Sequence, residues 1–190
     1  TYGANSRSGG IAVGTGGFSR FGLPTVPPTP DGFEEIYGLT TVGLYAMVAH
    51  RHMQQYGTTS EQLAQIAVTM RKHANKNPNA LFRDLITVDD VLNSRMISSP
   101  LHLLDCCVIS DGGGAVVVAS PDIARNCKKR PTWVLGFGEA IAHMGAGTRD
   151  LTTIAAAQSG PRAMSMAGIS HGDVDMAMIY DSFTITVLTT

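Results

Sequence analysis

The residues best suited to chemistry follow a short apolar segment and read Tyr180-Asp181-Ser182. A phenol donates a hydrogen bond at neutral pH, and in a site that lowers its pKa it can accept a proton. The apolar segment, residues 175–180, predicts a strand, and ligands of parallel α/β sheets gather beyond the carboxyl ends of strands. Tyr180 is therefore a candidate proton donor or base. The alternative is that its ring is buried at the end of a core strand, with Asp181 accepting hydrogen bonds from loop amides.

The cysteines and histidines do not form a recognisable metal or disulfide pattern. Cys106, Cys107 and Cys127 are odd in number, and two of them are adjacent, which fits neither a disulfide framework nor a zinc site. We expect reduced thiols. His50 and His52 are two residues apart in a helical stretch and so do not share a helix face, which predicts surface or packing histidines and no metal site.

Three apolar segments are expected to position these residues. A polar hinge, Ser110-Asp111-Gly112-Gly113-Gly114, leads into residues 115–119, which have the composition of a buried strand. Residues 132–138 predict a second buried strand with glycines at its exit, and residues 175–180 a third. A helix between the last two is expected to start at Gly160-Pro161 and to end at Gly168. This order of strand, helix and strand indicates a parallel α/β unit.

Helical signals dominate the first half of the chain. Residues 33–55 show a helical pattern, followed by a turn at Gly57. Thr58-Thr59-Ser60-Glu61 has the form of a capping box that opens a second helix, ended by Asn77-Pro78. Thr87-Val88-Asp89-Asp90 predicts a third, short helix. Residues 121–124 predict a short turn or helix, and 170–173 one further turn. Residues 183–189 are rich in β-branched side chains, and propensity alone predicts a strand there.

Composition excludes several classes of function. Fourteen basic and fifteen acidic residues leave a net charge of −1, without the basic surface that nucleic-acid binding needs. No apolar run approaches the roughly eighteen residues of a membrane span, and the first residues lack the order of a signal peptide, so a cytoplasmic protein is expected. The glycines at 14–17 lack the spacing and the lysine of a phosphate loop. Both ends interrupt a structural pattern, which suggests a piece of a longer protein.

Several motifs, in order, resemble the lipid-transfer-protein (sterol-carrier) branch of the thiolase family. Single motifs are weak, but their order and spacing agree over nearly the whole chain. They are Tyr56-Gly57-Thr58-Thr59-Ser60-Glu61-Gln62-Leu63-Ala64, residues 71–78, Ser110-Asp111-Gly112-Gly113-Gly114-Ala115, Gly160-Pro161-Arg162-Ala163 and Tyr180-Asp181-Ser182-Phe183.

The resemblance implies a partial thiolase-like α/β fold with αβαβα layers and an inserted, mainly helical loop domain. Residues 1–120 would be the later part of the N-terminal thiolase half, with the loop domain at about 20–105. Residues 121–190 would begin the C-terminal half. The resemblance also implies that residues 183–190 open a helix, against the propensity for a strand.

The resemblance further implies an acyltransferase that makes or breaks a carbon-carbon bond next to a coenzyme A thioester. Coenzyme A is then a substrate, and no cofactor is expected. The family's nucleophilic cysteine would lie before Thr1, and its acid/base cysteine and the histidine of its Gly-His-Pro motif after Thr190. Tyr180 stands where the family usually has Asn or His to stabilise an oxyanion, and Cys107 where biosynthetic thiolases have a serine lining the pantetheine channel.

The tyrosine leaves two alternatives open. A Tyr-Asp-Ser-Phe sequence resembles thiolase-like aldolases that cleave steroid side-chain coenzyme A esters and work with a small OB-fold partner, where Tyr180 would deprotonate a β-hydroxyl. A non-catalytic acyl-CoA or lipid carrier is the other alternative. The family resemblance also implies a homodimer.

Overall fold

The computed structural model describes residues 40–109, 113–141 and 150–190. The glycines at 14–17 and the hinge residues 110–112 lie outside these ranges, as does most of the loop expected over 139–150. Within them the elements follow in this order: α1 (Thr41–Tyr56), α2 (Ser60–Lys76), α3 (Val88–Leu92), β1 (Met96–Ser98), β2 (Leu101–His102), the 3-10 turn η2 (Leu103–Asp105), α4 (Pro121–Arg125), α5 (Ala156–Ala167), the 3-10 turn η3 (His171–Asp173) and α6 (Thr184–Thr189).

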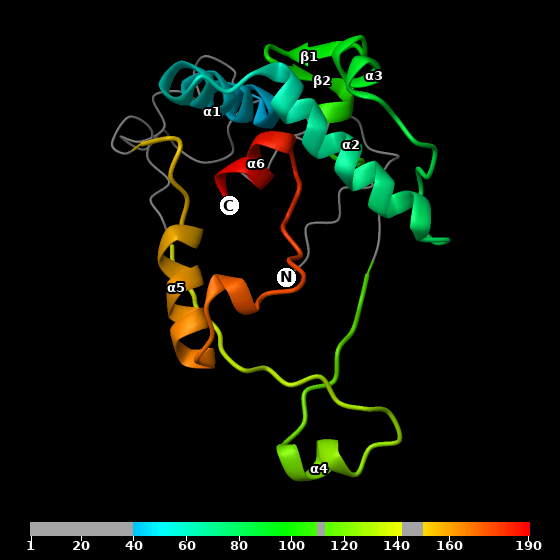
Figure 1. Cartoon of the computed structure of the whole chain (residues 1–190), viewed down its shortest axis with the longest axis vertical. Coiled ribbons are helices and arrows are strands. Elements are labelled where there is room, and N and C mark those ends of the chain that lie inside the picture. Colours follow the sequence, from blue (N-terminus) through cyan, green and yellow to red (C-terminus); the bar gives the residue numbers. More distant parts are fainter. Residues whose placement is uncertain (1–39, 110–112, 142–149) are drawn as a thin grey trace, which may run out of the picture.

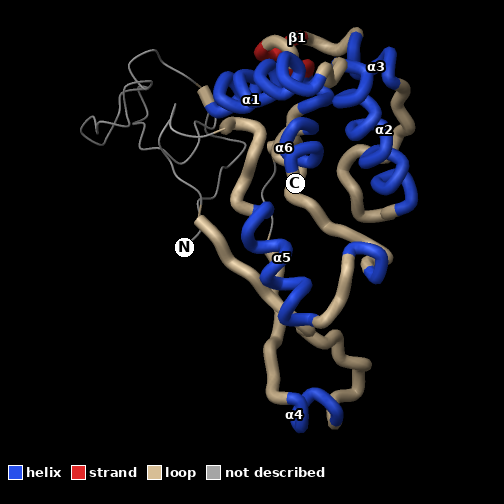
Figure 2. The backbone as a smooth tube through the Cα atoms, turned by 60° about the vertical axis from the view of Figure 1, so that its left-hand side comes forward, coloured by secondary structure: helices blue, strands red, loops and turns tan. Residues whose placement is uncertain are grey.

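Most elements gather at one end of the molecule. Helices α1 and α2 pack against α6 there, and α3 lies beside α2 near the antiparallel pair β1 and β2, whereas α4 lies at the opposite end (Figures 1 and 2). The last helix thus packs against the first two, although more than a hundred residues of sequence separate them. Its placement brings the segment after Tyr180 back to the helical part of the chain.

The sequence signals at the ends of α1 and α2 are those predicted, with one shift. Helix α1 ends at Gly57, whose φ of 70° is left-handed and suits glycine. The capping box of α2 is formed by Thr59 and Gln62, not by Thr58 and Glu61. Both pairs have the required spacing of three residues, so the sequence could not select between them. The predicted box at Thr87 is confirmed, with Asp90 as its partner.

Two clusters of buried side chains hold this end together. The first joins α1, α2, β2 and α6, and the second joins α2 to α3. Helix α2 contributes to both, because Leu63 and Ala64 are adjacent on its buried face. The first cluster consists of Ala46, Ala49, Leu63, Leu101, Phe183 and Ile185, and the second of Ala64, Ala67, Val68 and Val91.

Residues 184–189 form a helix, so the prediction from β propensity is wrong and the one implied by the resemblance is confirmed. Ile185 is fully buried, and the ring of Phe183 stacks on Tyr45 of α1 with centroids 4.4 Å apart. Hydroxyls of Ser182 and Thr186 lie 2.9 Å apart across the first turn. Tertiary packing therefore determines the conformation of this segment.

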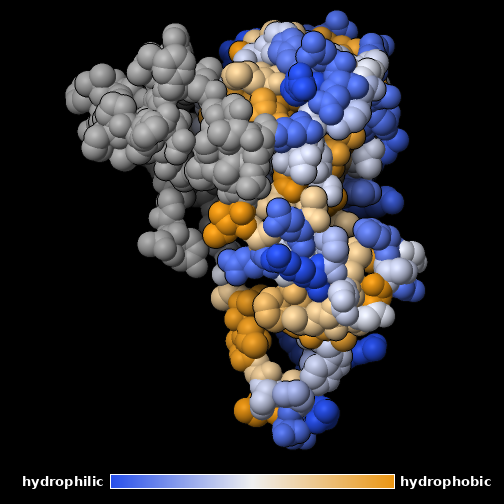
Figure 3. All heavy atoms as spheres, turned by 90° about the vertical axis from the view of Figure 1, so that its left-hand side faces the viewer, coloured by the Kyte–Doolittle hydropathy of each residue, from blue (hydrophilic) through white to orange (hydrophobic). Residues whose placement is uncertain are grey.

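The three segments expected to be buried strands are extended but exposed. Val117 is 95% exposed and Met178 92%, and none of the segments 115–119, 132–138 and 175–180 is a strand in this structure. A strand needs a neighbour to accept its hydrogen bonds. Within the described ranges only β1 and β2 form a sheet, so the predicted parallel unit is not present there. Figure 3 shows the apolar surface that this leaves on the lower part of the molecule.

Helix α5 begins four residues before the expected start and contains Pro161 in its interior. Its end is as predicted, with Gly168 in the left-handed conformation at φ 68°. The helix packs closely on residues 136–139: a Cβ at Gly138 would collide with the backbone of Ser159 and Ala163. The Nη1 of Arg162 donates to the carbonyl oxygen of Glu139 at 2.9 Å. The glycines at 136 and 138 are thus required by contact with a helix.

Candidate functional site

Two segments far apart in sequence meet at the candidate site. Cys106 pairs with Phe183 in an isolated antiparallel bridge, and the backbone N–H of Cys107 donates to the carbonyl oxygen of Ser182 at 3.0 Å. This register places Cys107 opposite Ser182 and Asp105 opposite Thr184. The structure therefore brings Cys107 next to the segment that holds Tyr180 and Asp181.

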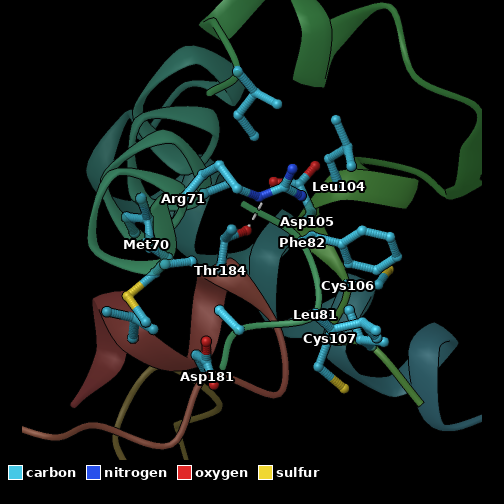
Figure 4. Close-up of a pocket in the computed structure, with 17 residues that line it drawn as sticks. Met70, Arg71, Leu81, Phe82, Leu104, Asp105, Cys106, Cys107, Asp181 and Thr184 are labelled. Carbon is cyan, nitrogen blue, oxygen red and sulfur yellow. Dashed lines mark hydrogen bonds between the residues drawn. The ribbon is translucent and has the colours of Figure 1, made fainter. Parts of the chain in front are cut away.

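A pocket of about 350 Å³ opens beside this bridge, between α2, the loop around Phe82 and the start of α6 (Figure 4). Its wall is mainly apolar, with Arg71, Asp105 and Asp181 as the charged residues. The side chains drawn in Figure 4 converge on it from all of these segments. The lining residues are Ile66, Ala67, Met70, Arg71, Ala74, Ala80, Leu81, Phe82, Ile86, Leu104, Asp105, Cys106, Cys107, Val108, Asp181, Thr184 and Val187.

Cys107 and Asp181 line the pocket, but Tyr180 does not. The tyrosine is 75% exposed, so its ring is not buried at the end of a core strand, as the alternative interpretation required. Adjacent residues of an extended chain point in opposite directions, which explains how Asp181 faces the pocket while Tyr180 does not line it. The structure therefore brings Cys107 and Asp181 together at the pocket and leaves Tyr180 outside its lining.

Both cysteines beside the bridge are held as thiols. Burial, followed by the charge of Asp105 and then Cys107, raises the pKa of Cys106 to about 11. Partial burial also raises the pKa of Cys107, although much of its surface is exposed, and the charge of Asp181 contributes further. A thiolate is the nucleophilic form, so neither side chain is activated for attack near neutral pH. In this geometry Cys107 can contact a ligand in the pocket without adding charge.

Sequence reasoning missed the buried carboxylate of Asp105, which is 4% exposed. Its Oδ1 accepts a hydrogen bond from the Thr184 hydroxyl at 2.9 Å, and its Oδ2 accepts one from the backbone N–H of His102 at 2.9 Å. The Nδ1 of His102 lies 3.5 Å from Oδ2. A charged residue inside the apolar run Leu103-Leu104-Asp105-Cys106-Cys107 was the available signal, because such residues are buried only when paired.

The cation of the pocket, Arg71, is held by α2 and the following loop. Its guanidinium lies 5.5 Å from the centroid of the Phe82 ring, and Nη1 donates to the carbonyl oxygen of Asp84 at 3.1 Å. These contacts fix one edge of the guanidinium against the pocket wall and keep the Phe82 ring at its rim.

The histidines singled out in the sequence lie away from this pocket. The Nδ1 of His52 is 2.7 Å from the Thr58 hydroxyl, and its ring contacts that of Tyr56. In residues 40–109, 113–141 and 150–190, no three His, Cys, Asp or Glu side chains form a group that could hold a metal ion. The helices in these ranges also include none that is long and apolar enough to cross a membrane.

Comparison with known proteins identifies the family. Residues 138–190 match the model of the thiolase C-terminal domain-like family. An acetyl-CoA acetyltransferase of Methanothermobacter thermautotrophicus is 40% identical over 84% of this chain and 44% of its own length. A steroid side-chain-cleaving aldolase of Thermomonospora curvata is 40% identical over 80% of this chain and 41% of its own length. The chain thus spans less than half the length of these relatives.

A solved structure is similar to this chain in both sequence and fold. It is the structure of an Ltp2-ChsH2(DUF35) aldolase, and it superposes with a TM-score of 0.78 at 37% identity, over 86% of this chain and 46% of the matched chain. Sterol carrier protein 2 of Gallus gallus is also among the relatives, at 29% identity over 88% of this chain and 30% of its own length. The chain belongs to the thiolase superfamily and has a thiolase-like α/β fold.

Proposed function

We propose that the protein to which this chain belongs acts on an acyl-CoA thioester, forming or cleaving the carbon-carbon bond next to it. The observation that carries the proposal is the bridge between Cys106 and Phe183. It sets a residue of the expected pantetheine channel, Cys107, beside the segment of the expected acid/base residue, Tyr180. Superfamily relatives named as an acetyltransferase and as an aldolase support the same class of substrate.

In the acyltransfer reaction, a thiolate attacks the acyl carbonyl while a second group moves a proton at the α carbon. Neither Cys106 nor Cys107 is activated for this attack, and the family resemblance implies that the nucleophilic cysteine lies before Thr1. Tyr180 would donate a hydrogen bond to the thioester oxygen as it becomes anionic, directly or through a water. Cys107 would line the channel for the pantetheine arm.

The same residues support a retro-aldol reaction, which the aldolase relatives favour. Tyr180, once deprotonated, would take the proton of a β-hydroxyl. The bond between the α and β carbons then breaks, the β carbon becomes a carbonyl, and the enolate of the thioester takes a proton. The similar aldolase structure carries the names of two proteins, Ltp2 and ChsH2, which is consistent with a small OB-fold partner for this chain.

We further propose the organisation expected of such a protein: αβαβα layers, a loop domain at about residues 20–105, and a boundary between halves near residue 120. The apolar segments 115–119, 132–138 and 175–180 form no strands here, and each would need a partner strand to take part in those layers. We propose a cytoplasmic homodimer.

The test uses the full-length protein and the variant Tyr180→Phe. Thiolysis is followed by the loss of a 3-oxoacyl-CoA, and retro-aldol cleavage by the carbonyl product released from a 3-hydroxyacyl-CoA. The variant should lower turnover roughly ten- to a thousandfold in whichever reaction is catalysed. Tyr56→Phe is the matched control, because Tyr56 is exposed and its hydroxyl contacts Gln55 and Thr152, away from the pocket.

Each outcome has a distinct meaning. Turnover of the 3-oxoacyl substrate alone supports the acyltransferase, and turnover of the 3-hydroxyacyl substrate alone supports the aldolase. Binding of acyl-CoA without turnover would identify a carrier. Unchanged turnover in a folded Tyr180→Phe variant would refute the role of the phenol.

A further inference from the structure

The buried carboxylate of Asp105 joins the two segments that form the candidate site. It stands directly before Cys106, and its hydrogen bond to Thr184 spans 79 residues of sequence. Thr184 is in turn the first residue of α6, four residues after Tyr180. We infer that Asp105 is a positioning residue, whose bond to Thr184 fixes Tyr180 and Asp181 relative to Cys107. The inference rests on the proposed function of that site.

The backbone contacts between the segments are too few to fix this arrangement alone. They comprise the isolated bridge at Cys106 and Phe183 and the hydrogen bond from Cys107 to Ser182. A strand pair as short as this one is marginally stable without packing or side-chain contacts. The bond from Thr184 to Asp105 is the next pair in the same register, so it extends the pairing by one side-chain contact.

Asp105 is itself held rigidly, which a positioning residue requires. The Oδ2 atom accepts the backbone N–H of His102 and so closes the η2 turn, and the side chain is buried. A hydrogen bond to a charged acceptor is about twice as strong as one between neutral groups. Loss of the Thr184 hydroxyl would leave Oδ1 facing the pocket wall without this donor, while Oδ2 still holds the turn.

Loss of the hydrogen bond between Thr184 and Asp105 should let the segment that holds Tyr180 shift. Such a shift should lower the rate of the chemical step more than the affinity for the substrate. A shift of about 1 Å in a reacting group costs on the order of a hundredfold in rate. Tyr180 is the group that would act on the reacting atoms, whereas α2 and the loop at Phe82 contribute most of the apolar pocket wall. We therefore expect a lower kcat with a nearly unchanged KM.

The experiment compares three variants of the full-length protein. Thr184→Val removes the hydroxyl and keeps the shape, Thr184→Ser keeps the hydroxyl, and Thr189→Val makes the same change on the same helix at a hydroxyl that bonds only to the carbonyls of its own turn. Thr184→Val should lower kcat roughly ten- to a hundredfold. Thr184→Ser should retain kcat within about threefold, as should Thr189→Val, with KM within about threefold throughout. If Thr184→Val does not fold, Asp105→Asn replaces it, with the same expectation for kcat.

A second readout does not need turnover. Iodoacetamide labelling, resolved by peptide mass, reports the rate at Cys106 relative to that at exposed Cys127. Loosening of the segment pair should raise this ratio at least threefold in Thr184→Val and leave it unchanged in Thr189→Val. If the wild-type protein turns over no acyl-CoA, the proposed function fails, and the labelling ratio alone decides the positioning role. An unchanged ratio, or an unchanged kcat in an active protein, overturns the inference.

Discussion

A single methyl group added at Gly138 tests whether α5 packs on the segment before the site as closely as the structure shows. The Cβ of an alanine would collide with the carbonyl of Ser159 and the amide nitrogen of Ala163, both backbone atoms of α5. Backbone atoms cannot rotate away as a side chain can, so the helix or the segment must shift. Overpacking of this kind costs about 1–3 kcal/mol, and Gly138→Ala should lower the free energy of unfolding by that amount.

Gly160→Ala is the matched control on the same helix. Apart from its chain neighbours and the backbone of its own helix, a Cβ at Gly160 meets no atom within 4 Å. Alanine favours a helix interior over glycine by about 0.8–1.0 kcal/mol, but Pro161 disfavours the helical conformation of a preceding residue that has a Cβ. These two effects oppose each other, so the control should change the free energy of unfolding by under about 1 kcal/mol, whereas Gly138→Ala lowers it. Denaturant unfolding of the full-length variants, followed by circular dichroism, measures both. The reasoning is refuted if Gly138→Ala unfolds at the same or a higher denaturant concentration than the wild type.

Two further predictions concern the buried cluster and the thiols. Leu63→Ala should lower the free energy of unfolding by about 2–5 kcal/mol, because Leu63 is fully buried against α1 and α6. The same change at half-exposed Leu44 should cost under about 1 kcal/mol. Equal losses for the two variants in denaturant unfolding would contradict the assigned cluster. With a pKa of about 11 against an ordinary 9.0, Cys106 should react with iodoacetamide at pH 8 on the order of a hundredfold more slowly than an unperturbed thiol. Because its pKa is raised, its thiolate and hence its rate should increase as the pH rises toward 11. The labelling rate of Cys107 should also increase with pH, and exposed Cys127 serves as the reference. The rates are measured by peptide mass mapping, and a Cys106 that labels as fast as Cys127 would contradict the raised pKa.

The helices could be predicted from sequence because their signals are local. The cap at Thr87 and the left-handed glycines at 57 and 168 each act within one turn, and the structure places helix ends at all three, while the cap of α2 lies one residue later than predicted, at Thr59. The early start of α5 could not be predicted in this way, because proline usually favours the first position of a helix and Pro161 lies inside one. A prediction based on the commonest use of a residue fails where the chain uses it otherwise.

The predicted strands failed for a different reason. Apolar composition indicates that a segment favours burial, but a strand also needs a partner that accepts its hydrogen bonds. Residues 115–119 have the composition without such a partner in the part of the chain that the structure describes. The pattern therefore identifies segments suited to a sheet, and it cannot state which neighbours complete the sheet.

The site was predictable only in part, because its contacts join residues far apart in sequence. Tyr180-Asp181-Ser182 could be found as polar residues after an apolar segment, and Asp181 does face the pocket. No local pattern pairs Asp105 with Thr184. The charge inside an apolar run does indicate that Asp105 needs a partner, since an unpaired buried carboxylate is costly. It does not indicate which residue supplies the hydrogen bond.

In helix α6, tertiary packing prevails over the local propensity of the residues. Its threonines, isoleucine and valine are each at most about 0.7 kcal/mol less favourable than alanine in a helix. Burial of Ile185 alone contributes about 1.5–3 kcal/mol, and the hydrogen bond from Thr184 to a buried carboxylate adds about 1.5–3 kcal/mol. These tertiary terms match or exceed the sum of the propensity costs, and both depend on the same packing of α6 against α1, α2 and η2. The helical conformation after Phe183 and the placement of Tyr180 beside the bridge therefore have one common cause, which lies in residues about eighty or more positions earlier in the chain.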